Sequence, residues 1–126
     1  MGFVEKTLKH RSKLTVAAAI LVYTAVMSWY TISKHNSFTT YAWDLGIFDQ
    51  SFWTTVNLGM VFVNTCEQHL VESGSFFGVH FSPILFLLVP FYYLHQSPVT
   101  LLALQSLIIG LSAYPIFLIA RERLTE

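Results

Sequence analysis

The residues of this chain that could do chemistry gather between positions 44 and 80. Asp44, Asp49, Glu67 and Glu72 lie in this stretch, and no Lys or Arg occurs from residue 35 to residue 120. A carboxylate in such a place can act as a general base, or it can hold a divalent cation such as Mg²⁺ or Mn²⁺ against a phosphate. Asp44 is therefore the first candidate for a catalytic or metal-binding residue, and Asp49 is the second.

The spacing of Asp44 and Asp49 limits what the two acids can do together. They are five residues apart, which on a continuous helix separates their side chains by roughly 140°. They cannot share one metal ion unless Asp44 precedes the helix, as it would if it capped a helix beginning at Leu45. The alternative interpretation is that Asp44 only caps the helix and that Asp49 lies on a solvated polar face.

A looser group of possible metal ligands follows, near Cys66. Glu67, His69, Glu72 and His80 are residue types that bind zinc and other transition metals. The group contains no HxxxH or CxxC spacing, and loop residues that face water explain it equally well. Cys66 is the single cysteine of the chain, so an internal disulfide is excluded.

Two long apolar segments flank these residues and predict an all-α integral membrane protein, organised as a single unit over residues 1–126. Residues 14–33 and 99–120 contain no charged side chain, and as helices each spans about 30 Å, the thickness of a hydrocarbon core. Charged residues make up 11% of the chain, against about 25% in a soluble domain. The alternative for residues 14–33 is a cleaved signal peptide, but its apolar region would be only about 7–15 residues long.

The distribution of charge predicts the orientation of the spans. Four basic residues precede the first span, so the positive-inside rule places the tail 1–13 in the cytoplasm and residues 34–80 outside. Residues 81–96 are apolar, but the run is short and is interrupted by Pro90. We expect an interfacial or re-entrant helix here, with a third span as the alternative. With two spans, the tail 121–126 returns to the cytoplasm with Arg121 and Arg123.

The external stretch itself predicts a helix over residues 45–56. Leu45, Phe48, Phe52 and Val56 recur at helical spacing, as in an amphipathic helix that lies along a membrane surface. The stretch is rich in aromatic residues, which anchor a protein at the membrane surface or form a platform for lipid or sugar. These aromatic residues are Tyr41, Trp43, Phe48, Phe52, Trp53, Phe76 and Phe77.

The second span carries a signal for helix packing. Ser106 and Gly110 form a small-xxx-small pair, which lets another helix approach closely. Pro115 is expected to bend the last turns of the span. Membrane lipid and other transmembrane helices are therefore the expected partners. Nucleic acid is not, because no basic patch lies between the ends of the chain.

Three blocks of the chain, taken together, resemble one known family. They are YAWDLGIFDQSFW at 41–53, GVHFSPILFLLVPFYYL at 78–94 and SPVTLLALQSLIIGLSAYPIFLIARERL at 97–124. In this order they resemble the polytopic prokaryotic membrane proteins of domain of unknown function 2079 (DUF2079). That family is similar in plan to the GT-C integral-membrane glycosyltransferases, which transfer a sugar from a lipid-phosphate carrier at the outer face. The resemblance implies a catalytic base or metal ligand soon after the first span, and by position this is Asp44.

The resemblance and the length of the chain lead to two hypotheses. GT-C enzymes often carry Glu after the acid, whereas Leu45 follows Asp44 here, and members of the family are several times longer than this chain. The first hypothesis is an N-terminal membrane segment of a GT-C-like transferase that is inactive alone. The alternative is a small non-catalytic transmembrane subunit that packs on a larger complex through its Ser106–Gly110 face.

The predicted layout can be tested at the C-terminal tail. An impermeant label applied to intact cells should fail to reach residues 121–126 and should reach them after the membrane is permeabilised. Labelling of this tail in intact cells would contradict the layout, and the role of Asp44 at the outer face would lose its basis.

Overall fold

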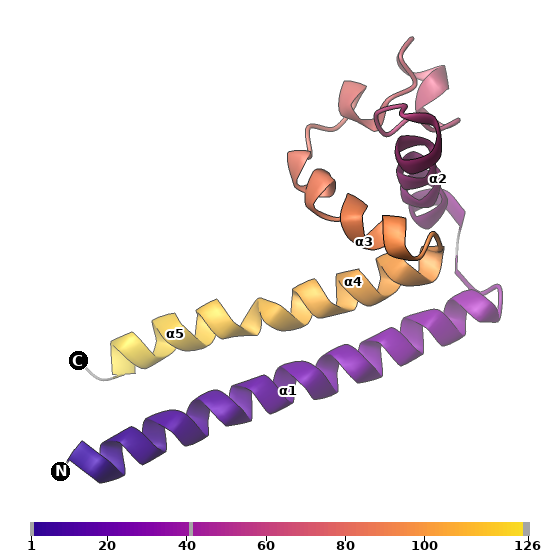
Figure 1. The fold of residues 1–126 in the computed structure, drawn as a ribbon. Helices are drawn as coiled ribbons and strands as arrows, with labels where there is room; N and C mark the ends of the chain where they lie inside the picture. Colours follow the sequence, from indigo (N-terminus) through magenta and orange to yellow (C-terminus); the bar gives the residue numbers. More distant parts are fainter. Residues whose placement is uncertain (1, 41, 125–126) are drawn as a thin grey trace. The chain divides into compact units, whose positions relative to one another are not determined.

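The computed structural model describes residues 2–40 and 42–124, which fold into helices joined by loops (Figure 1). The all-helical architecture predicted from the sequence is confirmed, and in the described ranges extended segments pair at an isolated bridge between Val63 and Ser75. The elements in chain order are α1 (Gly2–Asn36), α2 (Ala42–Leu58), the 3-10 helices η1 (Glu67–His69), η2 (Phe76–Gly78) and η3 (Pro83–Leu87), then α3 (Val89–Leu94), α4 (Pro98–Leu111) and α5 (Ala113–Leu124).

The chain divides into two compact units. The hairpin unit contains the chain up to residue 33 and from residue 102, and the loop unit contains residues 34–101. In the described part of the chain, two helical segments are long and apolar enough to cross a membrane, Arg11–Asn36 and Pro98–Leu124. They include both predicted spans, 14–33 and 99–120, and extend beyond them at each end.

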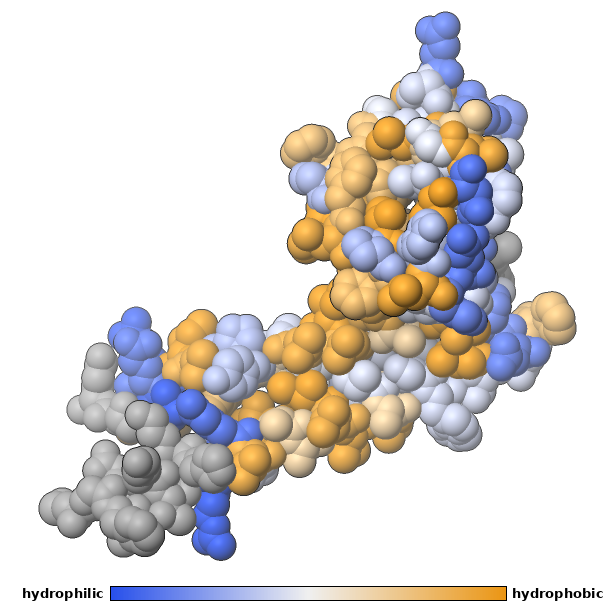
Figure 2. Space-filling model, in the orientation of Figure 1, coloured by the Kyte–Doolittle hydropathy of each residue, from blue (hydrophilic) through white to orange (hydrophobic). Residues whose placement is uncertain are grey.

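The long helices expose most of their apolar surface. Of the most apolar stretch in each, 6% is buried in the first and 17% in the second. Figure 2 shows hydrophobic side chains spread along the outer surface of both. Isolated apolar residues are normal on a soluble surface, but faces of this extent need an apolar environment.

The second apolar segment is interrupted where the sequence predicts a bend. Pro115 lacks an N–H, so the carbonyl of Leu111 loses its usual i+4 donor. The interruption falls at Ser112, between α4 and α5. The Ser112 N–H donates to the carbonyls of both Ile108 and Ile109, at 3.1 and 3.2 Å.

The small residues of α4 meet α1, as the small-xxx-small pattern predicts. Ser106 and Gly110 are both buried. A Cβ atom placed on Gly110 would lie 2.7 Å from Thr24 Oγ1 and 3.3 Å from a ring carbon of Tyr23. This part of the face therefore lies against the chain's own helix α1.

The loop unit has an aromatic core. Phe52 of α2 lies at 5.2 Å from Phe62, edge to face, and at 5.4 Å from Tyr92 of α3, between ring centroids. Phe76 and Leu85 complete the buried cluster. Side chains far apart in the sequence thus enclose one core, and burying each large ring contributes about 1.5–3 kcal/mol.

Helix α2 forms as predicted, but it begins earlier and packs differently. It starts at Ala42 rather than Leu45, so Asp44 lies in its first turn and is not the N-cap. Phe52 is buried, and Phe48 and Val56 pack against the same core. The apolar face expected on the membrane surface is therefore covered by the loop unit itself.

The segment 81–96 contains two short helices instead of one. Pro83 occupies the start of η3, and Pro90 lies in the first turn of α3 instead of breaking a helix. These helices have five and six residues, far fewer than the roughly 20 that a span requires. The structure therefore gives no support to a third helical span in this segment.

The approach of α1 and α4 can be tested by substituting Gly110 with valine. We expect overpacking against Thr24 to weaken the hairpin by about 1–3 kcal/mol. Cysteines placed at Val16 of α1 and Ala113 at the start of α5, which line the same groove as Gly110, should then cross-link more slowly with a short bifunctional maleimide. Cys66→Ser provides the background.

The matched control for this experiment is Leu111→Val. It places the same side chain at the neighbouring position, which is exposed. Equal cross-linking rates in the two variants would contradict the close packing at Gly110.

Candidate functional site

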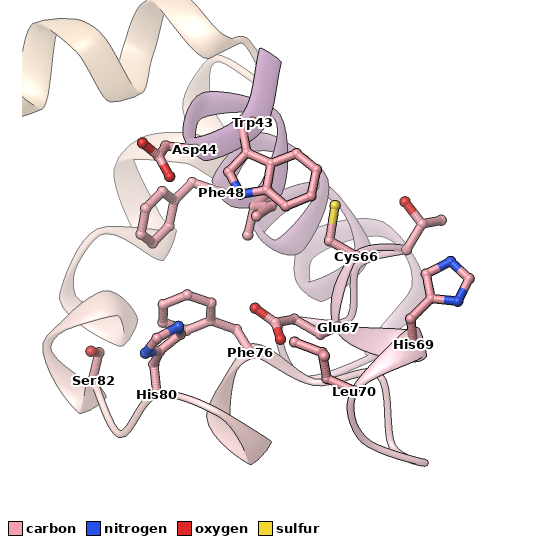
Figure 3. Close-up of a pocket in the computed structure, with 12 residues that line it drawn as sticks. Trp43, Asp44, Phe48, Cys66, Glu67, His69, Leu70, Phe76, His80 and Ser82 are labelled. Carbon is pink, nitrogen blue, oxygen red and sulfur yellow. The ribbon is translucent and has the colours of Figure 1, made fainter. Parts of the chain in front are cut away.

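The loop unit contains a cavity of about 770 Å³ between α2 and residues 65–82. Figure 3 shows the side chains that line it. Trp43, Phe48 and Phe76 supply aromatic surface. The polar lining includes Asp44, Thr65, Cys66, Glu67, His69, His80 and Ser82.

Helix α2 provides one wall through its first two turns. Trp43, Asp44, Ile47 and Phe48 line the cavity together, because positions three and four apart share one face of a helix. Asp44 is exposed, and Trp43 is 71% exposed. This wall therefore presents a solvent-accessible carboxylate beside an accessible indole ring.

Glu67 is held in the opposite wall by a buried polar link to α2. Asn64, which is 1% exposed, donates from Nδ2 to Ser51 Oγ at 3.1 Å and accepts the Glu67 N–H on Oδ1 at 2.9 Å. Gln50 Oε1 also accepts from the N–H and hydroxyl of Thr65, at 3.1 and 3.0 Å. The polar face of α2 therefore fixes the backbone that carries Glu67.

The wall that carries Phe76 depends on a tight turn at Gly74. Gly74 has a φ of +62°, and a Cβ atom there would lie 2.5 Å from Gln68 Cγ. After the turn, Ser75 Oγ donates to the Val61 carbonyl at 2.7 Å, and the Phe76 N–H donates to the Phe62 carbonyl at 2.9 Å. The turn thereby brings Phe76 back against the core.

The side chain of Glu67 is buried, and one of its two carboxylate oxygens has no hydrogen-bonding partner in the part of the chain that the structure describes. It is 3% exposed, and its Oε2 finds no donor among the described residues. Buried acidic side chains are ordinarily paired, because an unpaired carboxylate loses its hydration without compensation. Figure 3 shows the carboxylate pointing into the cavity, toward Phe76 and His80.

The two histidines of the cavity differ in their position. The His80 ring lies over Phe76, with ring centroids 4.8 Å apart and planes inclined by 37°. Both histidines are exposed, but in Figure 3 the His69 ring points away from Glu67, whereas the Glu67 carboxylate points toward His80. His80 is therefore the histidine on the side of the site that Glu67 faces.

The structure brings together some of the residues that the sequence singled out. Asp44, Glu67, His69 and His80 line the same cavity, whereas Asp49 and Glu72 do not. In residues 2–40 and 42–124, no three Asp, Glu, His or Cys side chains converge as a metal site would require. The described residues therefore do not form the predicted cluster of Glu67, His69, Glu72 and His80 around one ion.

Asp49 connects two helices. The Tyr92 hydroxyl donates to Asp49 Oδ1 at 2.6 Å, across 43 positions of sequence. Burial raises the pKa of Tyr92 above its ordinary value, and the hydrogen bond to Asp49 and the charge of that carboxylate raise it further. Asp49 therefore links α2 to α3 and is not simply a solvated residue of a polar face.

Sequence analysis did not identify the residues that prepare the site. Ser51 and Asn64 are fully buried yet polar, and nothing in their local pattern predicts that they meet. The one available signal was an Asn three residues before Glu67, which is a spacing typical of side chains that cap a turn. It could have indicated a fixed backbone at Glu67, although not a buried carboxylate.

Comparison with known proteins gives one family. The sequence pattern of the family described as "Predicted membrane protein (DUF2079)" matches residues 34–126. The match includes all of the loop unit and the whole second apolar segment. No curated protein matches the chain, and neither does any solved structure.

The unpaired state of Glu67 predicts a gain in stability when its charge is removed. Glu67→Met keeps the length of the side chain and eliminates a buried unsatisfied acceptor. We expect the free energy of unfolding to rise by about 1–3 kcal/mol, measured by thermal denaturation followed by near-ultraviolet circular dichroism in lipid nanodiscs. Glu72→Met is the control, because Glu72 is exposed, and its effect should stay within about 0.5 kcal/mol. A loss of stability in Glu67→Met alone would contradict the unpaired state.

Proposed function

The chain belongs to the DUF2079 family of predicted membrane proteins, and we propose that it is the N-terminal membrane segment of a GT-C-like glycosyltransferase-type protein. It would act on lipid-phosphate-linked sugars at the outer face of the membrane. The observation that carries the proposal is the cavity of the loop unit, where Asp44 and Glu67 share one space with aromatic rings. Such a mixture of apolar surface and few polar groups is typical of small-molecule sites.

The position of Asp44 along the chain supports the proposal. Helix α1 ends at Asn36, so Asp44 follows eight residues later. Eight residues reach at most about 28 Å, taking roughly 3.5 Å for each. The carboxylate therefore follows the first apolar helix after a short connection, as the proposal requires of a residue that serves a lipid-linked substrate.

Asp44 has the properties that either proposed role requires. Its side chain is exposed at the cavity, so an acceptor hydroxyl could approach it and transfer a proton to it. A carboxylate can equally hold a divalent cation. Both roles remain within this proposal, and both make the charge of Asp44 necessary for sugar transfer.

The phosphate of the proposed substrate needs a positive partner. Residues 35–120 contain no Lys or Arg, so a divalent cation such as Mg²⁺ or Mn²⁺, or basic groups of other helices, would balance its charge. Mg²⁺ is often bound by one or two carboxylates together with substrate phosphates and water. Asp44 fits as such a ligand even though no three metal-binding side chains converge among the residues that the structure describes. The ion would supply charge neutralisation at the phosphate.

The hairpin unit supports an association with further helices. Because little of either apolar helix is buried, lipid and additional transmembrane helices, in the same chain or another, would cover the rest. The proposed orientation keeps the N-terminus in the cytoplasm and residues 34–80 outside. The alternative function, a non-catalytic transmembrane subunit, is favoured by the same uncovered surface. Its contacts would use faces other than the one at Gly110.

The proposal predicts that Asp44→Asn abolishes sugar transfer. We expect at least a 100-fold loss in the transfer of radiolabelled sugar from a polyprenyl-phosphate carrier, assayed in the native membranes where any additional helices are present. The substitution keeps the shape of the side chain and removes the charge that a base or metal ligand needs.

Glu72→Gln is the control for this assay. It removes an exposed carboxylate of the same unit that does not line the cavity, and it should leave transfer unchanged. Equal turnover in Asp44→Asn and the unsubstituted chain would remove Asp44 from the mechanism and favour the non-catalytic alternative.

A further inference from the structure

We propose that Glu67 is the residue that binds the sugar in this cavity, and that the buried side of the cavity accepts an uncharged sugar ring and excludes a phosphate. The inference rests on the proposed function for the class of ligand. The role of Glu67 and the exclusion of a phosphate are inferred from the burial and charge of the lining residues.

The first observation is the unsatisfied acceptor. Glu67 is 3% exposed, its Oε2 has no donor among the described residues, and it lines the cavity. A buried acceptor without a donor is unfavourable, so a ligand that brings a donor gains the full benefit of that hydrogen bond. The hydroxyl groups of a sugar are such donors, and each can donate to the carboxylate while it accepts from another group.

The second observation is the aromatic surface beside this carboxylate. The Glu67 side chain points toward Phe76 and His80, whose rings lie over each other (Figure 3). Trp43 and Phe48 line the same cavity from α2. The C–H faces of a sugar ring are apolar and pack on aromatic rings, while its hydroxyl groups project from the edge. Aromatic rings next to a carboxylate therefore match the two kinds of surface that a sugar presents.

The third observation is the sign of the charge. Asp44 and Glu67 are carboxylates of the lining, and no Lys or Arg occurs from residue 35 to 120. A phosphate placed next to Glu67 would meet a like charge in a poorly hydrated environment, where repulsion is strong. Asp44 is exposed, so a phosphate near it would keep its water and counterions. The lining therefore disfavours a phosphate beside Glu67 and leaves this side of the cavity to an uncharged sugar ring.

The test is binding of free sugars to the full chain. Trp29→Phe and Trp53→Phe leave Trp43 as the single tryptophan, which reports from the wall of the cavity. The protein is held in nanodiscs of zwitterionic phospholipid, without sugar-based detergent and with EDTA. D-Glucose, D-galactose and D-mannose are titrated together with their 6-phosphates. We expect a saturable change in Trp43 emission for at least one sugar, and at least tenfold weaker binding of its 6-phosphate.

Variants then locate the binding site. Glu67→Gln should weaken binding of the responsive sugar at least tenfold, because a charged acceptor is replaced by a neutral amide. Glu72→Gln should leave it unchanged. Circular dichroism of each variant verifies the fold. Glu67→Asp provides a second substitution, which keeps the negative charge but shortens the side chain by one methylene. The preference for the uncharged sugar is measured on a chain that keeps Glu67, so it does not depend on how the variants fold.

Three results would overturn the inference. They are the absence of a saturable change with any of the sugars, binding of a 6-phosphate as tight as that of its parent sugar, and unchanged binding after Glu67→Gln. Binding requires no transfer, so this outcome is separate from that of the proposed function. Sugar binding with no effect of Asp44→Asn on transfer would contradict only the proposed function. Loss of transfer in Asp44→Asn without sugar binding at Glu67 would contradict only this inference.

Discussion

Phe52 and Phe62 meet edge to face in the middle of the loop unit, and the walls of the cavity are built outward from this contact. Phe62 is completely buried with a φ of +49°, a conformation that is uncommon for a bulky residue and persists only where the surroundings impose it. Its N–H donates to Thr55 Oγ1 at 2.9 Å, and its carbonyl accepts the N–H of Phe76. One aromatic contact thereby fixes α2 on one side of the cavity and Phe76 on the other.

The buried polar link beside this core explains how the unit can maintain an unpaired carboxylate. Asn64 donates to Ser51 Oγ and accepts the backbone N–H of Glu67. The backbone that carries Glu67 is therefore held by hydrogen bonds that do not involve the Glu67 side chain. A rigid position for an unsatisfied group lowers stability and is found where binding needs a prepared partner. In the proposed site, this buried carboxylate oxygen is the group that a bound ligand would satisfy.

The hairpin unit is held together by a different kind of contact from that in the core of the loop unit. Its helices approach each other where Gly110 allows Thr24 to come close, and most of the remaining apolar surface stays outside the protein. Inside a bilayer such a surface is at no disadvantage, and close packing of small residues is what holds the helices together. The loop unit instead has an aromatic core of its own, around Phe52, Phe62 and Tyr92, while other large apolar side chains of the unit, such as Phe81 and Leu94, stay exposed.

The sequence by itself determined the class of the protein and the presence of its long helices, because apolar length, proline position and small-residue spacing are local properties. It also indicated helix α2 and the packing role of Gly110. Tertiary structure decided that Asp44 lies in the first turn of a helix and does not cap it, and that the apolar face of α2 packs inward. It also decided that Asp49 bonds to Tyr92 and that Glu67 is buried. These features depend on contacts between residues many positions apart, and no periodicity within a single segment specifies which distant side chain will cover it.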